Sequence, residues 1–368
     1  MRKIMVVFGT RPEAIKMCPL VKELKREKEF HTVVCVTGQH KEMLQQVLKI
    51  FGICPDYNLE IMENNQTLFD ITEKILSKMH ILLQQECPDL VLVHGDTTTA
   101  FATALSAYYQ QIPLGHIEAG LRTYNIKEPY PEEFNRRAVG ILADYSFAPT
   151  QLAKENLVKE GKNSNTIFIT GNTVIDALKT TVSVDYNHEI LEWAKGARLI
   201  LMTVHRRENL GNSLYCIFRG IKRVLDEVDD IAIIYPIHKN PEVRRAAFQV
   251  FKQHERIRLI EPLGVIDFHN IMDRSYLILT DSGGIQEEAT ALGKPVLVLR
   301  NTTERSEGVK NGTLKLIGTD SDDVARNFKE LLADRDKYLK MCISSDLYGN
   351  GTACTQIVNI IKKHILFN

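Results

Sequence analysis

Short apolar runs separated by longer amphipathic segments are the feature of this chain that most restricts its fold. The segments between the runs have helical spacing, most clearly residues 67–85, where apolar side chains recur every three or four positions. Strands that are apolar throughout and alternate with helices predict parallel sheets covered on both faces. The predicted strands are 4–8, 32–37, 90–94, 114–117, 145–148, 166–170, 199–204, 231–236, 257–261, 276–280, 295–300 and 314–318.

The length of the chain and the spacing of the strands predict two domains. A chain of 368 residues is too long for one ordinary core. The series of strands divides near 171–198, where a helix is followed by a polar, irregular connection. We therefore predict an α/β protein with two Rossmann-like, doubly wound parallel-sheet domains, 1–170 and 171–352. Ligands of such folds bind beyond the carboxyl ends of the strands, so two facing domains are expected to form a central cleft.

The composition of the chain argues against several classes of protein. Formal net charge is zero, with 46 basic and 46 acidic side chains, which argues against a general binder of nucleic acid or membrane surfaces. The seven cysteines are scattered without a CxxC pair, so neither a disulfide framework nor a structural metal site is expected. The first apolar run, 4–8, is too short for a signal peptide, and no apolar segment is long enough to span a membrane. We expect a cytoplasmic protein.

Polar clusters follow several strands of the first half. After strand 4–8 comes Gly-Thr-Arg-Pro, with Arg11 at a helix start and Lys16 about a turn further on. This pattern favours an anion site at a helix amino terminus, although a solvated basic turn is the simpler alternative.

Three acidic residues are predicted near one edge of the first sheet. Asp96 and Glu118 each come just after a strand, and Glu132 opens a helix. Carboxylates gathered in this way suit proton transfer. Taken singly, Asp96 also suits a helix N-cap, and Glu132 suits the positive end of a helix dipole.

The second half contributes "TVHRRENLG", with His205 at a strand end, and "TDSGGIQEEATALGKP". In the latter stretch, Ser282, Gly283 and Gly284 offer a hydroxyl and backbone amides at a helix start, which suits a phosphate. Glu288 follows one turn later on the same helix face, and a carboxylate there suits a ribose diol. Amides followed by a carboxylate indicate a nucleoside diphosphate, with or without a sugar; the alternative is a helix start with solvated glutamates. Neither a GxxxxGKS nor a GxGxxG motif follows a strand.

Seven motifs together resemble one enzyme family along nearly the whole chain. They are "FGTRPEAIKMCPLV", "VHGDTTTAFATALSAYY", "GHIEAGLRT", "PYPEEFNRR", "GNTVIDAL", "HRREN" and "LTDSGGIQEEATALGKPVLVLRNTTERSEG". They resemble the non-hydrolysing UDP-N-acetylglucosamine 2-epimerases of bacteria. The resemblance implies a glycosyltransferase-B type fold, in which the last helix, 353–368, returns to the first domain. The implied reaction is reversible conversion of UDP-N-acetylglucosamine to UDP-N-acetylmannosamine through a 2-acetamidoglucal, without cofactor or metal, for cell-surface polysaccharide synthesis.

The resemblance also implies roles for individual residues. Catalytic positions are Asp96, Glu118, Glu132 and His205. Substrate-binding positions are Arg11, Lys16, Phe268, Ser282, Gly283, Gly284, Glu288 and Arg305. The sequence leaves open which carboxylate serves which face of C2.

An accessory site for a second UDP-N-acetylglucosamine, which activates many bacterial members, is implied at Gln39, Arg206 and His238. Glu42 and Asn65 stand where relatives often carry Gln and Arg, so we expect weakened or altered activation. A homodimer is also implied. The alternatives are a hydrolysing 2-epimerase, a glycosyltransferase of the same fold, and a catalytically silent nucleotide-sugar-binding protein.

Overall fold

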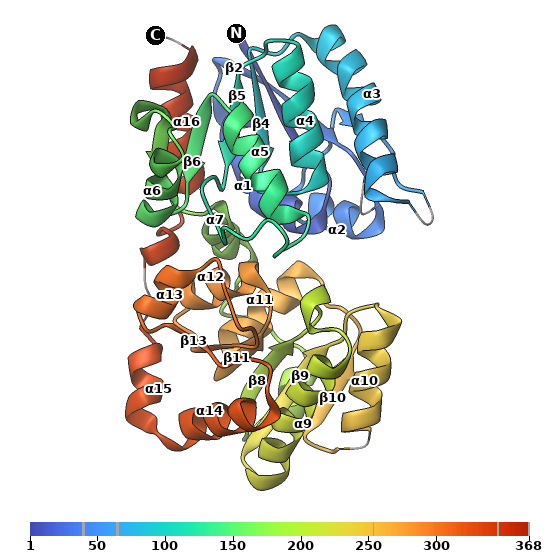
Figure 1. The fold of residues 1–368 in the computed structure, drawn as a ribbon, viewed down its shortest axis with the longest axis vertical. Coiled ribbons are helices and arrows are strands. Elements are labelled where there is room, and N and C mark those ends of the chain that lie inside the picture. Colours follow the sequence, from blue (N-terminus) through green and yellow to red (C-terminus); the bar gives the residue numbers. More distant parts are fainter. Residues whose placement is uncertain (39–40, 64–65, 253, 344–345, 367–368) are drawn as a thin grey trace. The chain divides into compact units, whose positions relative to one another are not determined.

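The computed structural model describes residues 1–38, 41–63, 66–252, 254–343 and 346–366, which form two compact units (Figure 1). Unit 1 comprises Met1–Lys179 and Tyr348–Asn368, and unit 2 comprises Thr180–Leu347. Each unit has one sheet in which neighbouring strands run parallel, with helices connecting them. The prediction of two doubly wound parallel sheets is therefore confirmed.

The sheet of unit 1 has the strand order β3-β2-β1-β4-β5-β6-β7 in the described residues. Val6 of β1 lies beside Val34 of β2 and Leu92 of β4, and all three side chains are buried. The strand order reverses between β1 and β4, which creates the crevice where ligands of such sheets bind. The strands are β1 (Arg2–Phe8), β2 (Phe30–Val36), β3 (Tyr57–Asn58), β4 (Leu90–His94), β5 (Leu114–Ile117), β6 (Tyr145–Ala148) and β7 (Ile167–Ile169).

The helices of unit 1 cover its sheet and include one from the end of the chain. Helix α16, red in Figure 1, packs on α1 and contributes Ile357 and Val358 to a core that also contains Val6 and Leu20. The helices are α1 (Arg11–Arg26), α2 (Lys41–Phe51), α3 (Leu68–Glu86), α4 (Thr98–Tyr109), α5 (Glu132–Leu142), α6 (Gln151–Lys159), α7 (Thr173–Thr181) and α16 (Ala353–Ile360).

Unit 2 repeats the doubly wound plan, with strand order β10-β9-β8-β11-β12-β13 in its described part. Its order reverses between β8 and β11. The strands are β8 (Arg198–Thr203), β9 (Ile231–Pro236), β10 (Ile257–Ile260), β11 (Leu277–Thr280), β12 (Val296–Val298) and β13 (Leu314–Leu316). The helices are α8 (Glu189–Trp193), α9 (Asn212–Glu227), α10 (Pro241–Phe251), α11 (Val265–Arg274), α12 (Gly283–Ala291), α13 (Ser306–Lys310), α14 (Ser321–Ala333) and α15 (Arg335–Met341).

The boundaries between the units differ from the predicted ones. The sequence predicts the first crossing at 170/171 and the return at 352/353, whereas the compact units divide after Lys179 and after Leu347. The first difference arises because α7 packs on unit 1, where Ala177 joins the core.

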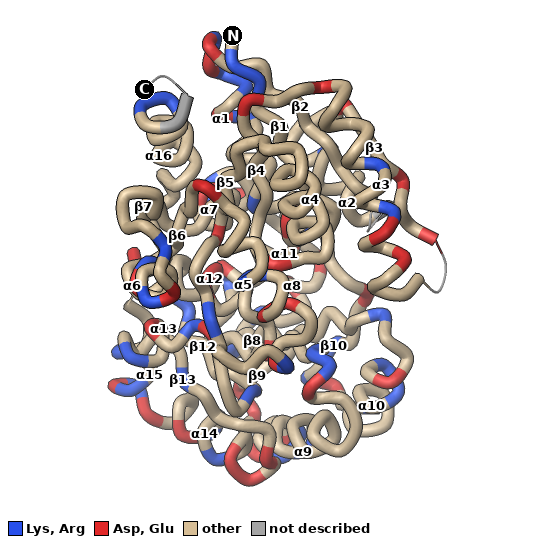
Figure 2. Tube along the Cα trace, turned by 45° about the horizontal axis from the view of Figure 1, so that its top comes forward, with Lys and Arg blue, Asp and Glu red and all other residues tan. Residues whose placement is uncertain are grey.

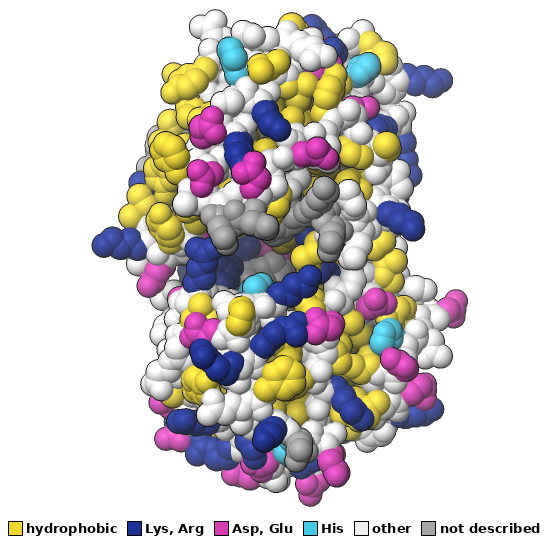
Figure 3. All heavy atoms as spheres, turned by 90° about the vertical axis from the view of Figure 1, so that its right-hand side faces the viewer, with side chains coloured by type: hydrophobic (Ala, Val, Ile, Leu, Met, Phe, Trp, Pro, Cys, Tyr) yellow, Lys and Arg dark blue, Asp and Glu magenta, His cyan; other side chains and the backbone are white. Residues whose placement is uncertain are grey.

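Charged residues of both signs are spread along both units (Figure 2). On the face drawn in Figure 3 they are interspersed with hydrophobic and uncharged side chains. Among the described residues, no helix is both long enough and apolar enough to cross a membrane. The same residues contain no group of three or more His, Cys, Asp or Glu side chains arranged to hold a metal ion.

Candidate active site

A buried carboxylate joins the two loops at the switch point of unit 1. Glu13 accepts hydrogen bonds from the amides of Gly9 (3.0 Å) and Thr10 (2.7 Å), which follow β1. Its other oxygen accepts the hydroxyl of Thr97 (2.6 Å), which follows β4. Burial raises the pKa of Glu13, and its hydrogen bonds oppose that shift. The two loops that present the candidate residues Arg11 and Asp96 are therefore tied together beneath the surface.

The structure excludes a simple N-cap role for Asp96. Thr97 is the N-cap of α4, and its hydroxyl accepts the amide of Ala100 at 3.0 Å. The Asp96 carboxylate instead meets Arg136 of α5, whose Nε lies 3.1 Å from Oδ2 and whose terminal nitrogen contacts the same oxygen. Arg136 also contacts the fully buried Glu133 at 3.1 Å. A planar guanidinium fixed on both sides gives the Asp96 carboxylate a defined orientation.

Glu118 is the centre of a second cluster in unit 1. Its Oε2 contacts the ammonium of Lys16, accepts the amide Nδ2 of Asn172 at 2.5 Å, and lies 3.6 Å from Nε2 of His94. The backbone of Glu118 has φ = 62°, in the left-handed region that non-glycine residues rarely adopt. Such conformations cost roughly 1–3 kcal/mol and cluster at functional sites.

The remaining candidates of unit 1 lie close to these loops. Arg11 is the first residue of α1, and Glu132 is the first residue of α5; both are half-buried. His116, on β5, supports the loop after β4, because its Nε2–H donates to the Gly95 carbonyl at 2.7 Å. Burial lowers the pKa of His116 to about 3, so the ring is neutral at ordinary pH.

A buried carboxylate also joins the loops at the switch point of unit 2. Asp281, directly after β11, accepts the amides of His205 (2.9 Å) and Arg206 (2.8 Å), which follow β8. The half-exposed His205 ring stacks on His238, with ring centroids 5.3 Å apart and planes 15° apart. Burial, and next the neighbouring His205, lower the pKa of His238.

Helix α12 begins immediately after Asp281 with the predicted phosphate loop. Ser282 is the N-cap, and its side chain makes no capping hydrogen bond to the helix. The first amides of α12 therefore lack a side-chain cap and suit an anion. Glu288 follows one turn later, and its Oε1 lies 3.8 Å from the position that a Cβ on Gly284 would occupy. The predicted geometry, amides first and a carboxylate one turn along the same face, is present.

The Glu288 carboxylate contacts a histidine of α11. Its Oε2 lies 3.5 Å from Nε2 of His269, and Nδ1 of that ring is 2.7 Å from the Thr181 hydroxyl. Phe268 precedes His269 on the same helix and packs, partly buried, against the second core of unit 2.

Arg305 and Glu287 form a buried ion pair behind the phosphate loop. The Nε of Arg305 donates to Glu287 at 2.8 Å, and its terminal nitrogen contacts Glu304. Glu304 in turn accepts from Arg300 at 3.0 Å. A Cβ at Gly283 would lie 2.8 Å from Cζ of Arg305, so a larger residue there would have to displace this guanidinium. The structure thus brings Arg305 close to the loop, with its guanidinium engaged by carboxylates.

Known proteins are similar in sequence to this chain along most of its length. Residues 22–362 match the sequence model of the family described as UDP-N-acetylglucosamine 2-epimerase. The UDP-N-acetylglucosamine 2-epimerase of Bacillus subtilis is 54% identical over 98% of this chain and 95% of its own length. The chain belongs to the UDP-N-acetylglucosamine 2-epimerase family. The predicted family is thereby confirmed, and with it the class of enzyme, an isomerase.

Two solved structures of similar proteins carry ligands. S. aureus MnaA, solved with UDP, is 52% identical, has a TM-score of 0.96, and is matched over 100% of this chain and 98% of its own. The UDP-GlcNAc 2-epimerase of Neisseria meningitidis, bound to UDP-GlcNAc, is 44% identical with a TM-score of 0.94, over 98% of this chain and 100% of its own.

The sequence did not reveal the residues that hold the candidate site residues and their loops in place. Glu13, Arg136, Asn172 and Asp281 are all buried or nearly so, and each contacts a candidate residue or its loop. Asn172 lies in the quoted "GNTVIDAL" motif, but nothing in that pattern specified Glu118 as its partner. A buried charge or amide needs a partner, so these polar residues in apolar surroundings were the available signal.

The accessory positions are only partly visible. Gln39 and Asn65 lie outside the described residues, as does the side chain of Glu42. Arg206 and His238 belong to unit 2, where Arg206 follows the half-exposed His205 and His238 stacks on the His205 ring.

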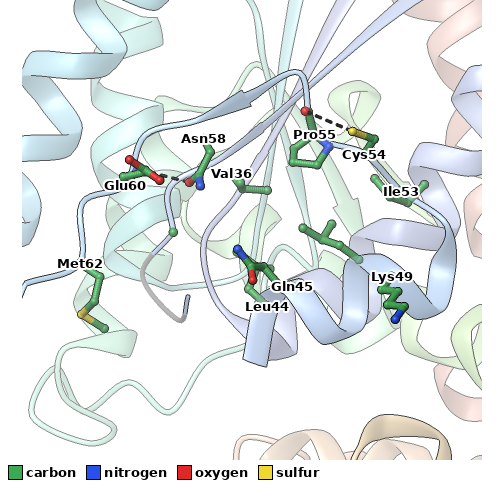
Figure 4. A pocket seen from close by; sticks show the side chains of 12 residues that line it. Val36, Leu44, Gln45, Lys49, Ile53, Cys54, Pro55, Asn58, Glu60 and Met62 are labelled. Carbon is green, nitrogen blue, oxygen red and sulfur yellow. Dashed lines mark hydrogen bonds between the residues drawn. The ribbon is translucent and has the colours of Figure 1, made fainter. Parts of the chain in front are cut away.

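A separate cavity of about 490 Å³ lies in unit 1 between β2, α2 and β3 (Figure 4). Its wall is largely apolar, with Leu44, Ile53 and Met62 among the lining side chains, and Lys49 and Glu60 also line it. None of the candidate catalytic carboxylates lines this cavity, so it is distinct from the clusters around Asp96 and Glu118.

Proposed function

We propose that this protein reversibly inverts C2 of UDP-N-acetylglucosamine, giving UDP-N-acetylmannosamine for cell-surface polysaccharide synthesis. The observation that carries the proposal is the pair of carboxylates at the switch point of unit 1: Arg136 fixes Asp96, while Lys16 and Asn172 contact Glu118. Inversion needs a proton removed from one face of C2 and returned to the other. Positioned carboxylates at one sheet edge suit that task.

The proposed reaction is an anti elimination followed by re-addition. A base removes the proton from C2, the C2–H electron pair forms the C1=C2 double bond, and the C1–O bond breaks with its electrons moving to UDP. UDP then adds back to C1 as a proton is delivered to the opposite face of C2. Asp96, Glu118 and Glu132 supply the proton-transfer groups in this proposal.

We assign the nucleotide to unit 2. The uncapped amides of α12 would hold the diphosphate with Ser282, Glu288 would accept hydrogen bonds from the ribose diol, and Phe268 would lie near the uracil. Arg11 would stabilise negative charge on the departing UDP, and His205 would act beside it as a further catalytic group. The proposal is supported by the ligands named in the two solved relatives, UDP and UDP-GlcNAc.

Incubation of the purified protein with UDP-N-acetylglucosamine in D2O tests the proposal. NMR is expected to show UDP-N-acetylmannosamine with deuterium at C2. Free N-acetylmannosamine and UDP as the main products would instead indicate the hydrolysing reaction. A glycosyltransferase would leave C2 without deuterium, and a silent binding protein would leave the substrate unchanged.

Matched variants test the catalytic assignment. Asp96→Asn and Glu118→Gln are each expected to reduce kcat by about 10²–10⁴-fold, the usual contribution of a proton-transfer group. Asp89→Asn is the control, because Asp89 lies at the opposite, amino-terminal end of β4, where it accepts the Lys3 amide at 2.7 Å. The assignment of Asp96 is wrong if Asp96→Asn turns over at the wild-type rate.

We further propose that the protein is a homodimer joined through unit 1. Large hydrophobic side chains are exposed on α3, α4 and α5, and hydrophobic side chains are visible on the surface of this unit in Figure 3. The exposed side chains on these three helices include Ile81, Tyr108, Tyr109 and Ile141. Exposed apolar surface of this kind marks interaction sites. Light scattering is expected to give twice 41.9 kDa for the wild type and a monomer for Ile141→Glu; a monomeric wild type would refute the proposal.

Weakened activation by substrate is proposed from Glu42 and Asn65. A carboxylate in place of Gln, and the loss of an Arg, reduce attraction for a diphosphate. The substrate curve is expected to be close to hyperbolic, and Glu42→Gln with Asn65→Arg is expected to make it sigmoidal. A wild-type curve as steep as that of typical bacterial members contradicts this proposal.

A further inference from the structure

Asp281 connects two parts of the candidate site in unit 2. One oxygen, Oδ2, accepts the amides of His205 and Arg206 and the side-chain amide of Asn209, at 2.8–3.0 Å. Ser282, the first residue of the phosphate loop, follows Asp281 directly in the chain. The loop that carries His205 and the loop that begins α12 are therefore joined through a single carboxylate.

The second oxygen of the same carboxylate has a different environment. Oδ1 is buried and has no hydrogen-bond partner among the described residues. It lies 3.8 Å from Nδ1 of His205. A buried carboxylate oxygen without a hydrogen bond is costly, and the distance to Nδ1 exceeds hydrogen-bond length by less than 1 Å. Hydrogen bonds of catalytic groups are often this long until the substrate binds.

We propose that Asp281 is the positioning residue for His205. It accepts the Nδ1–H of the imidazole, which fixes the tautomer and leaves Nε2 for the substrate. A purely structural role needs only Oδ2, because the loop amides and Asn209 all bond to that oxygen. The inference rests on the proposed function in one respect, that His205 acts on the UDP chemistry.

Ligand binding at α12 is expected to bring Oδ1 of Asp281 and Nδ1 of His205 together, because α12 begins next to Asp281 in the chain. A diphosphate at the first amides of α12 acts on residues that adjoin Asp281 in the chain. A small shift of the loop towards β8 would close the 3.8 Å separation between Oδ1 and Nδ1. The stack between His205 and His238 restricts the plane of the imidazole while this happens.

The tautomer of His205 can be measured directly. Protein labelled with ¹⁵N-histidine and saturated with UDP is examined by long-range ¹H–¹⁵N correlation, with His205→Gln used to assign the signal. The expected result is protonated Nδ1 in the wild type. A His205 that is protonated only at Nε2 overturns the inference, whatever the activity of the enzyme.

Asp281→Asn tests the same contact by substitution. The three donors at Oδ2 will hold the Asn carbonyl oxygen, which turns its NH2 towards His205. The imidazole is then expected to switch to the Nε2–H tautomer, and kcat to fall about 10²–10⁴-fold with little change in KM. Asp320→Asn is the control, since Asp320 of unit 2 accepts two backbone amides at the start of α14, at 2.8 and 3.2 Å.

A double-mutant cycle separates positioning from folding. If Asp281 acts through His205, then Asp281→Asn combined with His205→Ala is expected to have the kcat of His205→Ala alone. Fully additive losses would overturn the inference. Failure of the proposed function is distinguishable, because a wild type without epimerase activity would still show the tautomer of His205.

Discussion

The two adjacent glycines of the phosphate loop, Gly283 and Gly284, differ in how much room each leaves for a side chain. A Cβ at Gly283 would lie 2.8 Å from Cζ of Arg305 and 2.9 Å from Oε1 of Glu304, whereas one at Gly284 would meet only Oε1 of Glu288 at 3.8 Å. Gly283→Ala is expected to displace the buried ion pair and cost about 1–3 kcal/mol of stability. Gly284→Ala is expected to leave stability equal or raise it by up to about 1 kcal/mol, since alanine favours a helix.

The two variants also separate stability from ligand binding. If Gly284 approaches the diphosphate, its added methyl group is expected to weaken UDP binding in the more stable variant. Thermal unfolding and UDP calorimetry on both proteins provide the comparison. Equal melting temperatures for the two variants would contradict the steric argument.

His116 predicts an acid sensitivity in unit 1. Burial lowers its pKa to about 3, from an ordinary value of 6.5. Between these values the unfolded chain binds a proton that the folded protein does not, so stability falls as pH decreases from about 6.5 towards 3. Between these two pKa values the free energy of unfolding falls by at most about 1.4 kcal/mol per pH unit.

Urea unfolding between pH 7 and pH 4, followed by far-UV circular dichroism, measures that slope. His116→Gln removes the titrating ring and is expected to flatten it. His80→Gln, at an exposed position on α3, is the matched control and should retain the wild-type slope. An unchanged slope in His116→Gln would show that other groups cause the acid sensitivity.

The sequence could predict candidate residues but few of their partners. Asp96 and Glu118 were found because residues that follow parallel strands share one edge of a sheet. Their partners Arg136 and Asn172 lie 40 and 54 positions away in the chain and belong to other elements. Local pattern contains no information on such distant contacts. Local pattern also offered an N-cap role as the alternative for Asp96, and the adjacent Thr97 fills that role instead.

At the scale of elements, helix α16 depends on a carboxylate from another helix. Its own N-cap, Thr352, makes no side-chain capping bond, whereas Asp176 of α7 accepts the amides of Ala353 (3.2 Å) and Cys354 (3.0 Å). Asp176→Ala is expected to cost about 1–2 kcal/mol, as removal of an N-cap does. Hydrogen exchange should increase first in α16. Exchange that increases equally in unit 2 would contradict the assignment.

The positions of most strands were predicted correctly, because each strand is a short apolar run with clear ends in the sequence. The two-residue strand β3, Tyr57–Asn58, was missed, since neither residue is apolar enough to extend a run and its only described partner is β2. Residues 171–179, which include most of α7, were assigned to the second domain and belong to unit 1. The packing of α7 on unit 1 depends on Ala177 meeting a core formed by distant residues, which a local pattern does not reveal.

At the scale of the whole molecule, unit 2 is an insertion into unit 1. The segments on either side of the insertion lie together within unit 1, where the amide of Asn172 donates to the Tyr348 carbonyl at 2.7 Å. Unit 2 has cores on both faces of its own sheet, built from residues such as Phe218, Phe328, Ile278 and Val298. A chain segment with closely spaced ends and its own cores satisfies the requirements of an independent domain.

Expression of residues 180–347 alone tests this organisation. The fragment is expected to unfold cooperatively, with Trp193, the single tryptophan of the protein, as its fluorescent probe. The fragment 1–179 provides the contrast and is expected to remain poorly folded, because Ile357, Val358 and Ile361 are missing from its core. A well-folded 1–179 fragment would show that α16 is dispensable.

The late position of α16 has a consequence for synthesis on the ribosome. All of unit 2 leaves the exit tunnel before the helix that completes the core of unit 1. At ordinary elongation rates this interval is roughly 10–30 s. During that time the apolar surface of α1 that α16 will cover is open to solvent, to chaperones and to neighbouring nascent chains. The part of this enzyme that is made first is therefore the part that finishes folding last.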